Sequence, residues 1–145
     1  DEAMYIEKID RKQKVRLYTG VGRKAPLYAG ACSRVLLSFM DDQSIKDYIQ
    51  NTTLQQHAKG TITDKRKLYQ TIDEARKNGY TLSYAELQDH SAAIAAPIFD
   101  HMGKVIAGLS IAGIEMNYQG ENISFFAKKV INKANEISKR LGYKP

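Results

Sequence analysis

The spacing of hydrophobic positions alternates between helical and strand-like along the chain, and it predicts most of the secondary structure. Apolar residues recur at helical spacing in four segments, which predict amphipathic helices over 29–40, 41–50, 64–78 and 123–141. Short apolar segments with polar or glycine-rich borders predict strands at 3–9, 15–19, 80–84, 91–100 and 103–113. Strands near both ends with helices between them predict an α+β domain, in which helices flank one antiparallel sheet.

The strand pair at 91–100 and 103–113, joined by a turn at 100–103, has unusually small side chains. Strands normally favour β-branched and aromatic residues because these pack well on a pleated face. Small side chains on a strand indicate either a helix packed very close or a ligand above the sheet. The small positions are Ala92, Ala93, Ala95, Ala96, Ala107, Gly108, Ala112 and Gly113.

Length and composition indicate one ordinary globular domain in a reducing compartment. The chain has 145 residues, of which 43% are hydrophobic, and this suffices for a single packed core. No apolar run approaches the roughly 18 residues that a membrane span needs. The single cysteine, Cys32, cannot form an internal disulfide. We therefore expect a cytoplasmic domain without a membrane partner.

The formal charge of +6 raises the possibility of nucleic-acid binding, but the pattern does not favour it. Basic residues are scattered along the chain, whereas a nucleic-acid surface concentrates them in a stripe with base-reading groups between them. Dispersed charges are typical of solvated helix surfaces. Direct nucleic-acid binding through the basic surface remains an alternative that a salt titration would test.

The sequence contains no recognisable catalytic or metal-binding motif. His57, His90 and His101 are each isolated from other metal ligands, so no metal or other cofactor is expected. Cys32 or Ser110 could act as a nucleophile in a small hydrolase or transferase, but neither has a histidine nearby in sequence to serve as its base. A cysteine on an apolar helix is typically a small buried residue. A binding module without catalytic residues is the favoured interpretation.

An ordered set of motifs resembles the IclR family of bacterial transcription regulators. Residues 26–39 resemble the family's Pro-Leu-His-Ala-x-Ala-x-Gly-Lys-Ala-Leu-Leu-Ala motif, and residues 61–64 resemble its Thr-x-Thr-Asp entry to the next helix. Further matches, in the same order, are Arg76-Lys-Asn-Gly-Tyr80, Ile94-Ala-Ala-Pro-Ile-Phe-Asp100, Gly103, Leu109-Ser-Ile-Ala-Gly113 and Ile137-Ser-Lys-Arg-Leu-Gly142. The resemblance covers nearly the whole chain.

The resemblance implies the family's C-terminal effector-binding domain, with a curved antiparallel sheet flanked by helices as in GAF and PAS domains. Residues 1–145 would form this single domain, and the family's N-terminal winged helix-turn-helix has no counterpart in them. DNA would then be contacted only through a domain outside this chain. Family members act as homodimers or homotetramers, so exposed apolar residues on the 123–141 helix, Tyr5 or Tyr18 are candidate association surfaces.

The resemblance also implies a binding site for a small-molecule effector, often an organic acid or sugar acid. Gly30, Ala31 and Cys32, at the start of the first helix, would present backbone N–H groups to an anion. The four strand positions would be Ser83, Ala93, Ser110 and Ala112, where small-acid binders of the family tend to carry Asp, Cys, Ser and Ser. Only Ser110 keeps its polar group, which predicts a ligand larger or more apolar than a two- or three-carbon keto acid. Alternatively, Ala93 and Ala112 only admit close helix packing.

Overall fold

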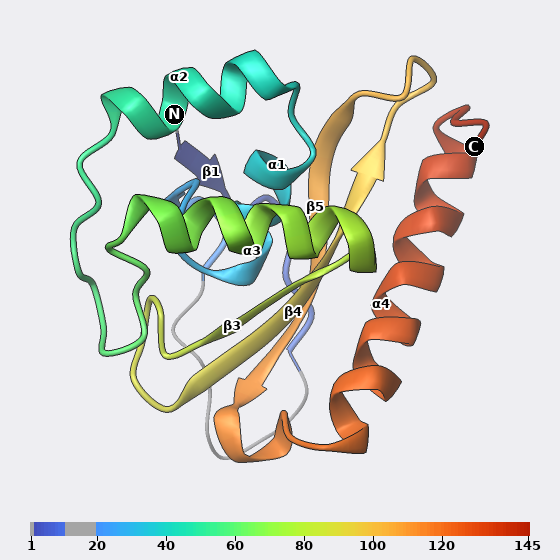
Figure 1. The fold of residues 1–145 in the computed structure, drawn as a ribbon. Coiled ribbons are helices and arrows are strands. Elements are labelled where there is room, and N and C mark those ends of the chain that lie inside the picture. The colour runs from blue at the N-terminus through green and yellow to red at the C-terminus, as the bar shows by residue number, and fades with distance from the viewer. Residues whose placement is uncertain (1, 11–19) are drawn as a thin grey trace.

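The computed structural model describes residues 2–10 and 20–145, and its longest strands form a three-stranded antiparallel sheet. The strands β3 (Thr81–Tyr84), β4 (Ser91–Phe99) and β5 (Val105–Ile114) lie side by side in that order (Figure 1). A separate two-stranded antiparallel sheet joins β1 (Glu2–Met4) to β2 (Lys24–Pro26). The α+β class is therefore as predicted, with the strands of the described residues divided between two sheets.

Four helices form where the apolar spacing predicts them: α1 (Ala31–Ser38), α2 (Asp42–Asn51), α3 (Lys65–Asn78) and α4 (Glu121–Arg140). A short 3-10 helix, η1 (Glu115–Asn117), precedes α4. Asp41 and Asp64 accept hydrogen bonds from the first turns of α2 and α3 and so fix where these helices begin. Gly79 ends α3 in the left-handed conformation, at a φ of 78°, where a side chain would be strained.

The two faces of the three-stranded sheet pack against different helices (Figure 1). Ala96 and Ile98 of β4 pack against Val130 and Ala134 of α4. Alternate residues of a strand point to opposite faces, and Ala95 accordingly packs against α1 on the other side. Small side chains thus occur on both faces, but the bulkier branched residues of β4, Ile94 and Ile98, lie on the α4 face.

The largest core cluster lies beyond α1, away from the sheet. It brings together α1, α2, α3 and the segment that precedes α1, through residues such as Leu37, Ile49 and Leu68. Because α1 is packed on both sides, its position relative to the sheet is fixed by burial of apolar surface. This helix forms one wall of the candidate site.

The N-terminal part of the chain departs from the predicted strand pair. The strand expected over 3–9 is observed only as β1, and β1 pairs with β2 at residues 24–26, for which the sequence predicts no strand. The register places Ala3 opposite Ala25, both of them apolar and at least half-buried. The strand predicted over 15–19 and the candidate association residue Tyr18 lie outside the described residues.

Candidate functional site

The four predicted strand positions lie on one face of the three-stranded sheet. Ser83 pairs with Ala93 across β3 and β4, and Ala93 pairs with Ala112 across β4 and β5. Ser110 lies two residues from Ala112 on the same face, opposite Ala95. Exposure to solvent increases along the cross-strand row Ser83–Ala93–Ala112. Ser83 is buried, Ala93 is half-buried and Ala112 is exposed.

The first turn of α1 is clamped to this face by two hydroxyl groups of β3. The Ala31 N–H donates to Ser83 Oγ at 3.1 Å. The Ala31 carbonyl accepts a hydrogen bond of 2.7 Å from Thr81 Oγ1. Both backbone polar groups of Ala31 therefore have protein partners, and its N–H, which we expected to face an anion, already has an acceptor.

Gly30, the residue before the helix, is held by a buried carboxylate. Its N–H donates to Glu86 Oε2 at 2.9 Å, and its backbone has a φ of 82°, at which a side chain would be strained. Glu86 is 5% exposed and forms an ion pair with Arg34, which is 1% exposed. Arg34 also donates from Nη2 to the carbonyl oxygen of Leu82 at 2.7 Å. This pair joins α1 to the end of β3.

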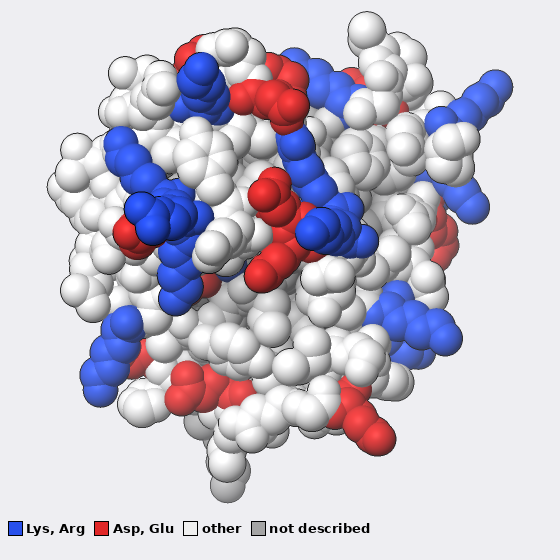
Figure 2. All heavy atoms as spheres, in the orientation of Figure 1, with Lys and Arg blue, Asp and Glu red and all other residues white. Residues whose placement is uncertain are grey.

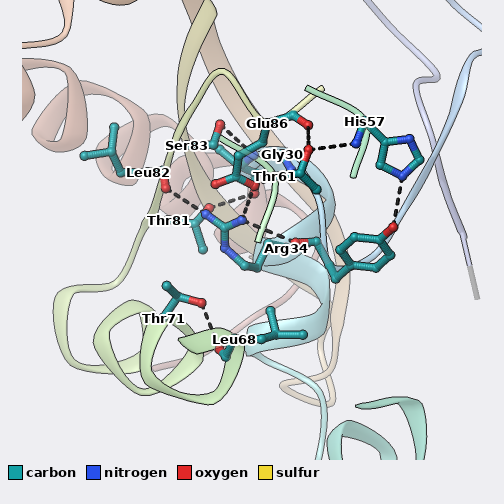
Figure 3. A network of polar contacts seen from close by, with 12 residues as sticks. Gly30, Arg34, His57, Thr61, Leu68, Thr71, Thr81, Leu82, Ser83 and Glu86 are labelled. Carbon is teal, nitrogen blue, oxygen red and sulfur yellow. Dashed lines mark hydrogen bonds and ion pairs between the residues drawn. The ribbon is translucent and has the colours of Figure 1, made fainter. Parts of the chain in front are cut away.

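Hydrogen bonds extend from this ion pair to the segment 52–64 (Figure 3). The Glu86 carbonyl oxygen accepts a bond of 2.6 Å from Thr61 Oγ1, and Thr61 Oγ1 in turn accepts from the N–H of His57 at 3.0 Å. The His57 ring contacts the Tyr28 hydroxyl through Nε2 at 3.0 Å. The network connects the start of α1 with a part of the chain 30 residues away in sequence.

Close packing fills the part of this face nearest the middle of α1. A Cβ atom on Gly108 would lie 2.6 Å from Val35 Cγ1 and 3.0 Å from the Cys32 carbonyl oxygen. Ala31, Val35 and Ala95 form a buried cluster here, with Ala93 and Cys32 at its edge. Small side chains at Ala95 and Gly108 therefore admit the helix, whereas Ala93 and Ala112 lie toward the exposed end of the face.

The Cys32 thiol has the surroundings of a structural residue. Its Sγ donates to the Gly108 carbonyl oxygen at 3.4 Å. Burial raises the pKa of the Cys32 thiol, and a hydrogen bond with Ser110 offsets only part of that rise. Since the thiolate is the reactive form, this environment disfavours a nucleophilic role for Cys32.

The described residues give no support to a metal site. Residues 2–10 and 20–145 hold no cluster of three or more His, Cys, Asp or Glu side chains that could bind a metal ion. His57, His90 and His101 are all exposed. Within the same ranges, no helix has the length and apolar character to cross a membrane.

Basic and acidic side chains are interspersed on the face of the molecule shown in Figure 2. Arg76 forms an ion pair with Asp42 at 2.7 Å, and Lys133 pairs with Glu136 at the same distance. This mixture is the pattern expected for solvated helix surfaces.

Sequence reasoning missed the residues that hold the start of α1 in place. Glu86 lies between the strands predicted at 80–84 and 91–100, where the sequence indicates no role for it, and Arg34 lies within the motif at 26–39. The one available signal was the placement of a charged residue, Arg34, one turn after Gly30 on a helix whose other positions are mostly apolar. The sequence does not indicate which residue pairs with Arg34, because Glu86 lies 52 residues further along the chain.

Residues 1–139 match the family model described as the C-terminal domain of the bacterial transcriptional regulator IclR. The chain belongs to the IclR family. The regulator KipR of Bacillus subtilis is 50% identical over 143 residues, which are 99% of this chain and 57% of KipR. The chain thus spans little more than half the length of this relative.

Solved IclR-type structures share the fold. IclR of Thermotoga maritima has a TM-score of 0.93 at 32% identity, over 98% of this chain and 57% of that one. The inducer-binding domain of PobR from Acinetobacter, solved as a double mutant with 3-hydroxybenzoic acid, has a TM-score of 0.76 at 28% identity. It is matched over 88% of this chain and 74% of that domain. The resemblance inferred from the motifs is confirmed, and the curated relatives are transcription regulators.

Proposed function

We propose that this chain is the effector-binding domain of an IclR-type transcription regulator, and that its effector binds over Ala93 and Ala112 beside the start of α1. The observation that supports this most is the cross-strand row Ser83–Ala93–Ala112, which passes from buried to exposed on a face of small side chains. The inducer-binding domain of PobR, which has the same fold, has been solved as a double mutant with 3-hydroxybenzoic acid. That complex supports a small organic molecule as the effector here.

The side chains of this face favour a ligand with a substantial apolar part. Ala93 and Ala112 offer methyl groups, and Ser110 contributes a hydroxyl group in the adjacent row. An apolar ligand gains roughly 25 cal/mol for each Å² of apolar surface that it buries, whereas a two- or three-carbon keto acid has little such surface. Among effectors larger than a keto acid, we therefore propose an aromatic acid ahead of a polyhydroxylated sugar acid, with Ser110 near its polar end.

In the whole protein, the effector would change DNA binding through a separate winged helix-turn-helix domain. Such coupling requires that the effector bind two arrangements of the protein with different affinity, typically by 1–3 kcal/mol. The protein would act in the cytoplasm as a homodimer or homotetramer, and Phe125 on α4 is 58% exposed and available for association. No catalytic step is part of this proposal.

Isothermal titration calorimetry with a panel of ligands tests the proposed site. The panel consists of pyruvate, glyoxylate, gluconate, benzoate and 3-hydroxybenzoate, each titrated into the wild-type chain. We expect the larger acids to bind more tightly than pyruvate and glyoxylate. Tightest binding of pyruvate or glyoxylate would refute the size assignment.

A pair of variants locates the binding on the molecule. Ala112→Phe adds a ring to the exposed end of the row and should abolish binding of the ligand selected by the panel. Met116→Phe is the matched control, because Met116 is 70% exposed in η1, outside the sheet. Unchanged binding in Ala112→Phe would place the ligand elsewhere and contradict the proposed site.

A further inference from the structure

The pairing of the N-terminal segment with the residues before α1 continues one position beyond β1 and β2. The Tyr5 N–H donates to the Arg23 carbonyl oxygen at 2.9 Å, and the Tyr5 carbonyl oxygen accepts from the Gly22 N–H at 2.7 Å. The register pairs Met4 with Lys24 and so places Tyr5 opposite Arg23 at the next position. Residues directly opposite each other in an antiparallel pair have their side chains on the same face. The Tyr5 and Arg23 side chains therefore lie side by side.

The face that carries these two side chains is directed toward α1. Alternate residues of a strand point to opposite faces, so Tyr5 shares a face with Ala3, which packs against the core cluster that includes α1. The strand β1 also contacts α1 directly (Figure 1). Tyr5 and Arg23 are half-buried, whereas Met4 and Lys24, on the opposite face, are exposed. The Arg23 side chain thus lies on the inner face of the N-terminal pair.

Tyr5 and Arg23 adjoin the end of the candidate site where Ser110 lies. Burial raises the pKa of the Tyr5 phenol, the nearby Cys32 thiol raises it further, and the nearby Arg23 guanidinium lowers it. Cys32 in turn hydrogen-bonds with Ser110, beside which we place the effector's polar end. These contacts bring a positive charge from the N-terminal pair to the polar end of the site.

An arginine in this place suits a carboxylate ligand. Its guanidinium group stays charged at neutral pH and presents parallel N–H donors that match the two oxygens of a carboxylate. Half-burial of Arg23 reduces screening by water, so its attraction for an anion is stronger than that of an exposed cation. The neighbouring Cys32 thiol does not oppose an anion, because burial raises its pKa and keeps it protonated at neutral pH.

We propose that Arg23 binds the carboxylate of the effector and makes the site selective for acids. The carboxylate would lie between Arg23 and Ser110, and the apolar part of the effector would lie over Ala93 and Ala112. The inference rests on the proposed function, since it concerns the polar end of the same ligand. It predicts that loss of the Arg23 guanidinium weakens the binding of acids and not that of neutral analogues.

Lys24 provides a matched control, because it is the next residue and carries the same charge on the opposite face. Its Nζ lies 3.8 Å from Glu2 Oε2, and its side chain is 63% exposed. Arg23→Gln and Lys24→Gln each remove one positive charge. An effect of net charge alone would therefore weaken acid binding equally in both variants, whereas only Arg23→Gln removes the group proposed to contact the carboxylate.

The experiment measures by calorimetry how tightly 3-hydroxybenzoate and 3-methylphenol bind to wild type, Arg23→Gln and Lys24→Gln. In 3-methylphenol a methyl group replaces the carboxylate, so it offers Arg23 no acceptor at that position. A hydrogen bond to a charged group corresponds to about ten- to hundredfold in affinity. We expect Arg23→Gln to lose this factor for the acid and to bind 3-methylphenol within about twofold of wild type. Lys24→Gln should bind both compounds within about twofold of wild type.

Arg23→Lys is a second variant that keeps the charge but not the parallel donors. It should bind the acid less tightly than wild type and still prefer it to 3-methylphenol. Loss of that preference would contradict the inference whether or not Arg23→Gln folds, because a cation at position 23 would then not be recognising the acid.

The inference is overturned if acid binding is unchanged in Arg23→Gln or falls equally in Lys24→Gln. An equal loss of 3-methylphenol binding in Arg23→Gln also overturns it, because Arg23 would then support the structure of the site and not recognise the carboxylate. If either compound binds wild type and Ala112→Phe abolishes that binding, the effector site stands even though the role of Arg23 does not. If neither compound binds wild type, the inference fails together with the proposed aromatic effector.

Discussion

Gly108 lies so close to Val35 that a Cβ atom on the glycine would be 2.6 Å from Val35 Cγ1. Real Cβ atoms do not approach other atoms this closely, so any side chain at position 108 must displace the Val35 side chain or shift α1 from the sheet. The contact therefore sets how closely the helix that begins the candidate site can approach β5.

Gly108→Ala should destabilise the domain by about 1–3 kcal/mol, as over-packing of a closely packed contact does. Denaturant unfolding followed by circular dichroism measures this change. Gly20→Ala is the control, because nothing lies within 4 Å of a Cβ atom there and its φ is not in the left-handed region. Equal free energies of unfolding for Gly108→Ala and wild type would contradict this prediction, because they would mean that the contact with α1 relaxes without loss of stability.

The buried ion pair between Arg34 and Glu86 should be essential to folding stability. Glu86→Gln keeps an acceptor for the Gly30 N–H but leaves the Arg34 guanidinium buried without its counter-charge. Breaking one side of a buried pair typically costs about 3–5 kcal/mol, so we expect a loss of this size in the free energy of unfolding.

The exposed pair of Arg76 and Asp42 gives the comparison for Glu86→Gln. The Asp42 side chain is 89% exposed, and Asp42→Asn should change stability by less than about 1 kcal/mol. A loss in Glu86→Gln no larger than that in Asp42→Asn would contradict the structural importance of the buried pair.

Tyr118 should make the domain less stable in strongly alkaline solution. Burial raises the pKa of its phenol from 10.0 to about 12. Between these values the unfolded chain loses this proton while the folded protein keeps it, so stability falls as the pH rises through this range. Below pH 10 both the folded and the unfolded chain keep this proton, so the stabilisation from Tyr118 is fully present.

Chemical denaturation of wild type and Tyr118→Phe at a series of alkaline pH values checks this dependence. Tyr118→Phe should lose stability less steeply above pH 10, because the titrating group is gone while the packing of the ring against Phe126 is preserved. Parallel curves for the two proteins would exclude Tyr118 as the source.

Cys32 should react slowly with iodoacetamide at neutral pH. Burial raises the pKa of its thiol, and alkylation proceeds through the thiolate. Mass spectrometry of native and denaturant-unfolded protein gives the two rates, and the unfolded chain serves as the control. Fast labelling of the native protein would revive the alternative in which Cys32 is a nucleophile.

The sequence predicted the helices well because their determinants are local. Asp41 and Asp64 cap the helices that follow them, and Gly79 stops α3 in a conformation that suits glycine. These signals act within a few residues, so a single sequence carries them. Ala93, Ser110 and Ala112, which the resemblance to the family names, lie on one face of β4 and β5.

The interactions that organise the candidate site could not be predicted in this way. Ser83 caps Ala31 from 52 residues away, and nothing near either residue indicates the pairing. The same holds for β1 and β2, which pair although the sequence predicts no strand at residues 24–26. In each case a contact between distant segments decides which polar group is satisfied, and a local pattern cannot encode that choice.

Glu86 bonds with its side chain to the start of α1 and with its backbone to Thr61. One residue thus contacts two parts of the chain that are distant in sequence. A displacement of the first turn of α1 would therefore act on Thr61 through Glu86, in addition to the contact that joins Tyr28 to His57.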